Sequence, residues 1–407
     1  MKIFRFSLII FSFVLIIVLG YEARFVDRTI NKVGFNSPGS PKYMSGELSH
    51  VSFMNIASHT FEDLLSFKSI LKYPTDICRT EMLIRGSISK ERKYHFTHAL
   101  LLSGIFESRL SEDEKIFSSL ELWCEELIES DGRLRIKVKY IDECMLGYIF
   151  CELYERTQRL KYKVAAEQFA NYLLEEYPRS SNGTLPYSKE NIETSLIDDK
   201  GMICGFLIRY GEQFDVQEAT ALGVHQLKEY LDTAIDTDTG LPWQAYKSNV
   251  SRKMGLLGWL RGIGWVTMGL SQSLEYLPQT HVNYNELKLR FIDLLNVIKE
   301  YQIKGECWPW EIRNPDAHID ASGTSMIGYV VENAIEAGTI DSTWSKISEN
   351  ALIGVLKSTQ NNGAIDNDLA DVKGIGQFPK YFGPSNYAQG PTTSLYSLVL
   401  RRKLHLK

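Results

Sequence analysis

Residues 197–206 of the chain read IDDKGMICGF, in which two aspartates stand directly before an apolar run that is spaced by glycines. Similar small-residue and apolar stretches recur about every 50 to 70 residues along the chain. They are HFTHALLLSGIF (95–106), IDECMLGYIF (141–150), RGIGWVTMGL (261–270), ASGTSMIGYV (321–330) and QGPTTSLYSL (389–398). Because their apolar residues occupy all sides rather than one stripe, we expect each stretch to be a helix that other helices cover on every side.

Most of these stretches are followed by a helix of a different kind, with an apolar stripe of period i, i+3, i+4. No segment shows the sustained alternation that is typical of strands. The chain is therefore predicted to be all-α, with six units of an inner and an outer helix. Such units form a closed double ring, the (α/α)6 toroid of six hairpins, although an irregular helical array or an open solenoid has the same pattern.

The composition is that of a globular protein with a large core, since 44% of the 407 residues are hydrophobic. Fifty acidic and 45 basic residues give a net charge of −5, and there is no basic run beyond the first few residues. Nucleic acid is excluded as an expected partner. Neither the six scattered cysteines nor the eight histidines form a metal-binding motif, so no metal or organic cofactor is expected, and the cysteines are predicted to be free buried thiols.

The N-terminus carries a targeting signal, because Lys2 and Arg5 precede the apolar run 6–21. Residues 1–21 are read as a cleaved signal peptide or an uncleaved membrane anchor, 22–50 as a tether, and 51–407 as the folded domain. Either form of the segment predicts a domain outside the cytoplasm, exported or anchored to the membrane. The oligomeric state has no signature in the sequence.

In a ring of this kind, the loops before the inner helices meet at one mouth. Asp198 and Asp199 stand there, and Asp142 and Glu143 repeat the arrangement one unit earlier. An aspartate before a helix can simply be its N-cap, which leaves a structural and a catalytic interpretation open for each. Glycosidases need two carboxylates from different elements, and Asp142 and Asp198 supply such a pair, in which a charged neighbour and apolar surroundings would raise the pKa of the more buried acid.

Aromatic and polar residues also gather before the inner helices, where they suit the faces and hydroxyls of sugars. The candidates for substrate binding are Tyr187, Trp243, Gln244, Tyr246, Trp259, Arg261, Trp265 and Trp308. Arginine is included because its guanidinium can hold a carboxylate with two hydrogen bonds. The alternative interpretation of each tryptophan is a structural one, in which its side chain packs in the hydrophobic core.

From about residue 140 to 400 the chain resembles the unsaturated glucuronyl and rhamnogalacturonyl hydrolases, glycoside hydrolase families 88 and 105, which are six-hairpin toroids. The resemblance rests on Asp142, on Asp198 with KGMICGFLIRYG, on DTGLPWQAYK, on WLRGIGWVTMGLSQSLEYLP and on ASGTSMIGY, in this order. The run Arg-Gly-x-Gly-Trp ending in Leu-Pro is the most distinctive of these motifs.

The resemblance implies removal of a 4,5-unsaturated uronic acid from the nonreducing end of acidic oligosaccharides that lyases release. It implies that Asp198 is the acid and base, that Asp142 is its partner, and that Arg261 with Trp259 and Trp265 belongs to the substrate cleft or its structure. Asp199 would then be a cap or support.

Two positions depart from the family pattern, because Gln244 and the Tyr187-Ser188 segment stand where many relatives have histidine. Gln244 can hydrogen-bond a sugar but cannot carry a proton at neutral pH. Two other interpretations follow: a toroid hydrolase or lyase of another acidic polysaccharide, and a catalytically silent, membrane-tethered glycan-binding protein.

Overall fold

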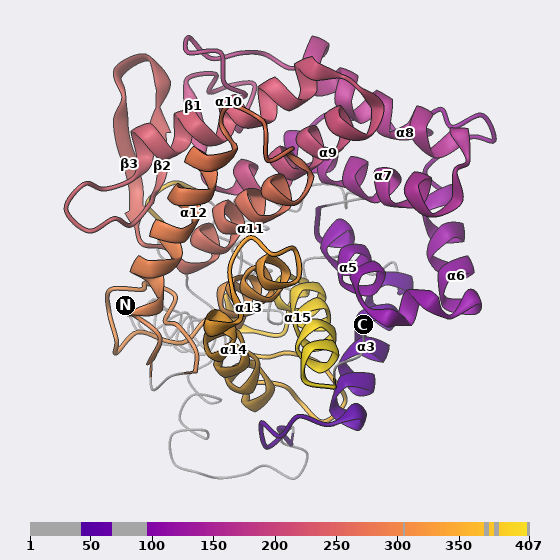
Figure 1. Cartoon of the computed structure of the whole chain (residues 1–407), viewed down its shortest axis with the longest axis vertical. Coiled ribbons are helices and arrows are strands. Elements are labelled where there is room, and N and C mark those ends of the chain that lie inside the picture. The colour runs from indigo at the N-terminus through magenta and orange to yellow at the C-terminus, as the bar shows by residue number, and fades with distance from the viewer. Residues whose placement is uncertain (1–41, 67–95, 304–305, 370–373, 378–381, 405–407) are drawn as a thin grey trace, which may run out of the picture.

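The computed structural model describes residues 42–66, 96–303, 306–369, 374–377 and 382–404, and most of them are helical (Figure 1). Six helices form an inner ring in which each contacts the next, and the last contacts the first. These inner helices are α5 (Phe96–Glu107), α7 (Leu146–Thr157), α9 (Gly205–Phe214), α11 (Leu260–Tyr276), α13 (Ala321–Glu336) and α15 (Asn386–Leu404). The six stretches expected to be inner helices all lie in this ring, so the chain has the closed α/α arrangement rather than an open solenoid.

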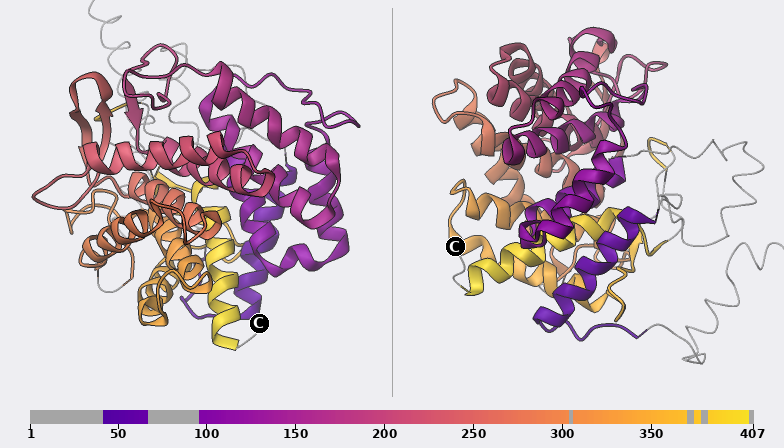
Figure 2. Two further views of the ribbon diagram at one scale, coloured as in Figure 1. Left: turned by 45° about the horizontal axis from the view of Figure 1, so that its top comes forward. Right: turned by 90° about the vertical axis from the view of Figure 1, so that its right-hand side faces the viewer.

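A second set of helices lies outside the ring, as the two further views of the ribbon show (Figure 2). They are α3 (His50–Leu65), α6 (Glu114–Glu125), α8 (Leu160–Asn171), α10 (Gln217–Ala234), α12 (Tyr284–Lys299) and α14 (Ser345–Lys357). Short 3₁₀ turns are η1 (Arg109–Glu112), η2 (Ile141–Met145), η5 (Ser248–Val250) and η7 (Ser342–Trp344), and π turns are η3 (Tyr172–Glu176) and η4 (Lys200–Cys204). The outer helices present one apolar face inward, as α6 does with Leu120, Trp123 and Cys124.

Glycine closes the ring where α5 meets α15. A Cβ atom on Gly390 would overlap the carbonyl oxygen of Leu100, and one on Gly104 would meet the backbone of Gly390. The two helices therefore approach backbone to backbone, which a larger residue would prevent.

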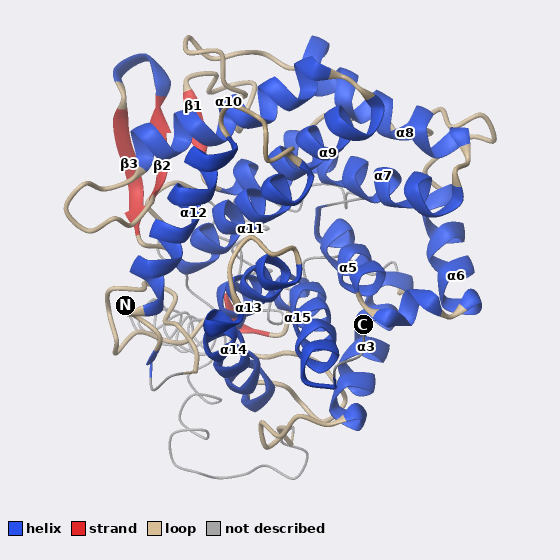
Figure 3. Ribbon diagram, in the orientation of Figure 1, coloured by secondary structure: helices blue, strands red, loops and turns tan. Residues whose placement is uncertain are grey.

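Two small sheets were not expected from the sequence (Figure 3). Strands β1 (Thr194–Leu196), β2 (Trp243–Lys247) and β3 (Arg252–Leu257) form an antiparallel sheet in this order, and β4 (Asp368–Leu369) pairs with β5 (Phe382–Gly383). The strands have two to six residues, too few to show an alternating pattern. The chain is mostly helical, as predicted, and these short strands add to the ring of helix pairs.

The folded part begins before residue 51, within the segment expected to be a tether. Met44 N donates to the carbonyl oxygen of Thr359 at 2.8 Å, and the Tyr43 hydroxyl donates to Asp366 at 2.7 Å. Residues 42–49 are thus bound to the ring. The run 6–21 lies outside the described residues, and within those residues no helix combines the length and the apolarity needed to cross a bilayer.

The five described cysteines, Cys124, Cys144, Cys151, Cys204 and Cys307, are free and buried, which confirms the prediction for these positions. Cys78 lies outside the described residues.

Candidate active site

The two candidate acids lie on turns that precede neighbouring inner helices. Asp142 is in η2, directly before α7, and is 5% exposed. Asp198 follows β1, directly before η4 and α9, and is half-buried. The turns η2 and η4 contact each other, as do α7 and α9. Sequence reasoning placed the acids on adjacent inner helices, and the structure has the two segments side by side.

Tyr177 experiences the negative charge of an acid from each of the two segments. The pKa of Tyr177 is raised, first by burial and then by nearby groups that include Asp199 and Asp142. The pKa of Tyr230, on α10, is raised by burial and by the charges of Asp198 and Asp199. The carboxylates from both turns therefore share one electrostatic environment at this mouth.

Glu143, next to Asp142, has a structural role. Its carboxylate accepts hydrogen bonds from the backbone N–H groups of Lys139 and Tyr140, at 2.8 and 3.1 Å. This is the reach-back of a capping box at the start of η2. Of the two acids in this turn, Asp142 is the one not used as the cap.

Asp199 differs from the expected helix cap. It stands at the start of η4 but its side chain makes no capping hydrogen bond. Instead, Oδ2 lies 3.4 Å from Nζ of Lys200, and both side chains are fully buried. Burial raises the pKa of Asp199, while the charge of Lys200 opposes the rise. Asp199 thus supports the site as the counter-ion of a buried lysine.

Arg261, the second residue of α11, is 1% exposed and is held from several directions. Its guanidinium lies 4.1 Å from the ring centre of Tyr387 and 5.5 Å from that of Trp259. Nη1 donates to the carbonyl oxygen of Leu369 and is 3.9 Å from Oδ1 of Asp368. These contacts support the structural alternative, in which Arg261 ties α11 to β4 beneath the mouth.

Asp368, the acidic partner of Arg261, is part of a pair of buried carboxylates. Burial and the nearby Asp320 raise its pKa to about 7, and Arg261 lowers it. Asp320 caps α13 by accepting from Ser322 N at 3.0 Å, and it also accepts from Leu369 N. The cluster of Arg261, Asp368 and Asp320 joins the N-terminal ends of α11 and α13.

Several aromatic candidates lie in the interior. Trp265 and Tyr246 have no exposed surface, Trp259 is 4% exposed, and Trp308 is fully buried with its Nε1 donating to the carbonyl oxygen of Ile298 at 2.7 Å. Trp265 makes an edge contact with Phe96. All four side chains are buried, and Nε1 of Trp259 and of Trp265 has no hydrogen-bond partner among the described residues, so contact of these four residues with a substrate stays a prediction.

Around the three-stranded sheet, the other candidates are more open. Trp243 is half-buried and its Nε1 donates to Asp236, whereas Tyr187 is 43% exposed. Gln244 is 3% exposed, and its side-chain oxygen accepts from Leu256 N and Gly376 N at 3.3 and 2.8 Å. Its backbone oxygen accepts from Ile197 N at 2.9 Å, one residue before Asp198. Gln244 therefore holds neighbouring backbone in place.

A cavity of about 280 Å³ opens beside this sheet and includes Tyr187, Ser188 and Lys247 in its wall. The sequence interpretation missed Lys247, because only the pairing of β1 with β2 brings this lysine to the segment before Asp198.

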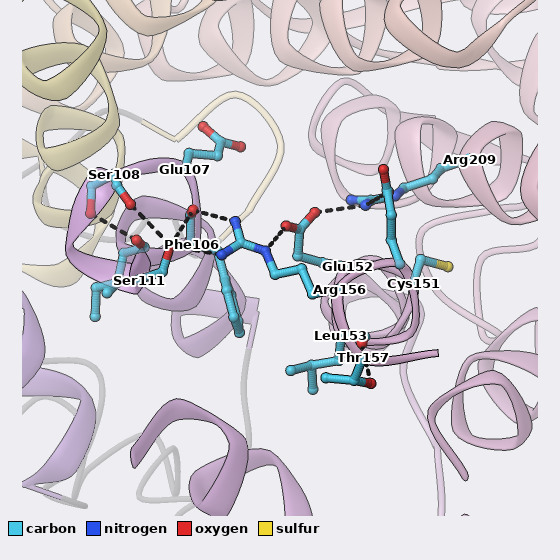
Figure 4. A network of polar contacts seen from close by, with 12 residues as sticks. Phe106, Glu107, Ser108, Ser111, Cys151, Glu152, Leu153, Arg156, Thr157 and Arg209 are labelled. Carbon is cyan, nitrogen blue, oxygen red and sulfur yellow. Dashed lines mark hydrogen bonds and ion pairs between the residues drawn. The ribbon is translucent and has the colours of Figure 1, made fainter. Parts of the chain in front are cut away.

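A second cavity, of about 310 Å³, lies at the opposite end of the ring, among the C-terminal ends of inner helices. Figure 4 shows its network: Arg156 donates to Glu152, Ser111 and the backbone of Phe106, and Arg209 donates to Glu152. Burial raises the pKa of Glu107 in this wall to about 8. Asp142 and Asp198 do not line it, so this polar cluster is separate from the acids of the other mouth.

A ring of helix pairs with two carboxylates on adjacent turns at one mouth is suited to a carbohydrate-cleaving enzyme, and among the described residues no trio of metal-ligating side chains is grouped. Comparison of the chain with known protein families agrees with this class. The model of Glycosyl Hydrolase Family 88 matches residues 73–396, so the chain belongs to this family and is a glycosidase.

Relatives span nearly the whole domain at low identity. The chain is 20% identical over 338 residues to the unsaturated rhamnogalacturonyl hydrolase YesR of Bacillus subtilis (strain 168). The matched region covers 80% of this chain and 95% of that protein. A possible GH105 member from Klebsiella pneumoniae has a TM-score of 0.75 at 17% identity, covering 90% and 97% of the two chains. The unsaturated glucuronyl hydrolase of Bacillus sp. GL1 has a TM-score of 0.63 at 14% identity, covering 87% and 97%. These structures share the fold.

Proposed function

We propose that the chain removes a 4,5-unsaturated uronic acid from the nonreducing end of acidic oligosaccharides. The observation that carries the proposal is the contact between η2 and η4, which places Asp142 and Asp198 on adjoining turns in a chain of Family 88. The similarity to an unsaturated rhamnogalacturonyl hydrolase supports this class of substrate.

In the proposed reaction, Asp198 gives a proton to C4 of the C4=C5 enol ether, and positive charge develops at C5 and the ring oxygen. A water molecule adds its oxygen to C5 and returns a proton to Asp198. The hemiketal at C5 opens to a ketone, and the hemiacetal left at C1 expels the aglycone as an alcohol. One water is consumed, the ring C5–O bond and the C1–O bond to the aglycone are broken, and no covalent glycosyl-enzyme forms.

Asp142 has a supporting part in this scheme. Its carboxylate stays on the adjacent turn, where its negative charge favours the protonated form of a neighbouring acid and stabilises developing positive charge.

The test is to incubate the purified chain with lyase-generated unsaturated disaccharides and follow loss of the enol-ether ultraviolet absorbance. The proposal requires loss of absorbance that Asp198→Asn abolishes while the variant keeps the wild-type circular dichroism spectrum. A flat trace with folded wild-type protein over a broad panel of unsaturated uronides would refute it.

We also propose that the run 6–21 exports the domain or anchors it to the membrane, so that the enzyme meets its substrate outside the cytoplasm. Cell fractionation of the full chain and of a chain lacking residues 1–21 tests this. Equal recovery of both forms in the cytoplasm would contradict it.

A further inference from the structure

The cavity beside the three-stranded sheet is lined by polar, aromatic and apolar side chains and by one lysine. It measures about 280 Å³, near the lower end of the size of small-molecule sites, which suits one sugar unit. Its wall combines β1, β2 and β3 with two other segments of the chain, 187–191 and 374–377. The side chains that matter here are Tyr187, Asn191, Thr194, Lys247, Met254 and Ile375.

Lys247 sets the charge of this cavity. It is the charged side chain among the lining residues, and within the described part of the chain no carboxylate forms an ion pair with it. The carboxylate of Glu190 follows the lining residue Ser188 by two residues and accepts a hydrogen bond from its hydroxyl. Among the described residues, therefore, no carboxylate competes with a bound anion for the ammonium group of Lys247.

The rest of the wall suits a sugar ring. Tyr187 is 43% exposed and offers an aromatic face, and Met254 and Ile375 give an apolar surface. Asn191 and Thr194 add an amide and a hydroxyl that can bond to sugar hydroxyls. A cation, an aromatic ring and neutral polar groups together fit a sugar that carries a carboxylate or sulfate.

The wall is held in place by Gln244. Its side-chain oxygen accepts from Gly376 N, next to Ile375, and from Leu256 N on β3. Gly255 has a φ of +82°, and a Cβ atom there would meet both Gln244 and Ile375. The loop with Ile375 is thus fixed against the sheet, so the cavity exists before a ligand binds.

The cavity lies within reach of Asp198. Thr194 pairs with Lys247, and Asp198 follows Thr194 by four residues, at most ~13 Å of extended chain. An oligosaccharide whose terminal unit lies at Asp198 can place a following unit here. Resting on the proposed function, we infer that this cavity is the aglycone subsite and that Lys247 selects substrates whose aglycone carries an anionic group.

The experiment compares unsaturated disaccharides that share the terminal uronate and differ in the aglycone: neutral, carboxylated or sulfated. For Lys247→Gln we expect KM to rise about tenfold or more with both anionic aglycones, the effect of losing one charge-assisted contact, while kcat and the neutral substrate change less than about twofold. Lys247→Arg should restore most of the affinity. Lys346→Gln, on the outer helix α14, is the matched control and should match wild type.

An equal change of KM for neutral and anionic aglycones would overturn the inference. A rise with only one anionic aglycone would identify the anion and support it. Calorimetric binding of saturated disaccharides with the same aglycones gives a second readout that needs no turnover. Equal affinity of wild type and Lys247→Gln there would overturn the subsite even if the enzyme is active, whereas an inactive wild type that still distinguishes the variants would refute the proposed function alone.

Discussion

Asp199 and Lys200 form an ion pair in which neither side chain has any exposed surface, with 3.4 Å between Oδ2 and Nζ. Nζ also donates to Oε1 of Gln226 at 3.1 Å, which ties η4 to α10. The pair directly follows Asp198 in the sequence. Of the two adjacent aspartates, Asp199 therefore belongs to a buried ion pair in the interior.

Because of this pair, we expect that removing one of the two charges lowers the free energy of unfolding more than removing both. Asp199→Asn leaves a buried ammonium without its counter-ion, and such a loss costs about 3–5 kcal/mol. The double variant Asp199→Asn with Lys200→Met removes both charges and should recover most of the free energy of unfolding. Urea denaturation of the three proteins measures this, and a double variant no more stable than Asp199→Asn would contradict the assignment.

The inner helices were predictable from sequence because helices covered on all sides need small and apolar residues throughout. Gly390 and Gly104 show why, since backbones touch there. The sheet was not predictable, because the partners of Thr194–Leu196 lie about 50 residues away in Trp243–Lys247 and the strands are short. Pairing across such distances leaves no local pattern.

The candidate acids were predictable from their place before inner helices, but the fate of individual aromatic residues was not. Trp308 is buried and its indole N–H donates to the carbonyl oxygen of Ile298. A sequence does not show whether an indole finds such a partner in the interior or meets a ligand. The resemblance implied that Asp199 is a cap or support, and only the structure shows that it is the counter-ion of the buried Lys200 and not a cap.

A second prediction separates Asp142 from its neighbour Glu143. Asp142→Asn should lower kcat by about 10²-fold or more, as expected for an essential carboxylate, with little change in stability. Glu143→Ala should remove the cap of η2 and lower the free energy of unfolding by about 1 kcal/mol, while kcat falls only a few-fold. Steady-state kinetics and urea denaturation of both variants check this. The reverse pattern would exchange the two roles.

A third prediction concerns Arg261 and Asp368. Arg261→Met leaves Asp368 buried next to Asp320 without its cation, so the pKa of Asp368 rises further above about 7. A raised carboxylate pKa makes the folded state hold a proton, and stability then falls as pH rises toward that pKa. The variant should therefore lose more Tm relative to wild type at pH 8 than at pH 5.5.

The control for Arg261 is the double variant Arg261→Met with Asp368→Asn, which removes the carboxylate that Arg261 balances. It should have a smaller pH dependence than Arg261→Met alone. If both variants lose the same Tm at both pH values, the guanidinium acts through its stacking on Tyr387 rather than through its charge.

Glu107, in the cavity at the far end of the ring, predicts a pH dependence of folding that is independent of the proposed active site. Burial raises its pKa from 4.5 to about 8, the neighbouring charge of Glu275 adds to the rise, and a hydrogen bond from Tyr329 opposes it. Between these two pKa values the folded protein holds a proton that the unfolded chain has released. The contribution of Glu107 to the free energy of unfolding is therefore complete below pH 4.5. It is lost as pH rises to about 8, by at most about 1.4 kcal/mol per pH unit.

Glu107→Gln keeps the shape and the neutral state of the side chain, so its stability relative to wild type should increase steadily from pH 5 to pH 8.5. The matched control is Glu336→Gln, in the same cavity wall but half-exposed and paired with Arg401 at 2.9 Å; its difference from wild type should not rise with pH. Urea denaturation at several pH values measures both differences. A difference for Glu107→Gln that stays constant across this range would show that the carboxyl group releases its proton without a cost to the fold, and would remove Glu107 as a source of the pH dependence.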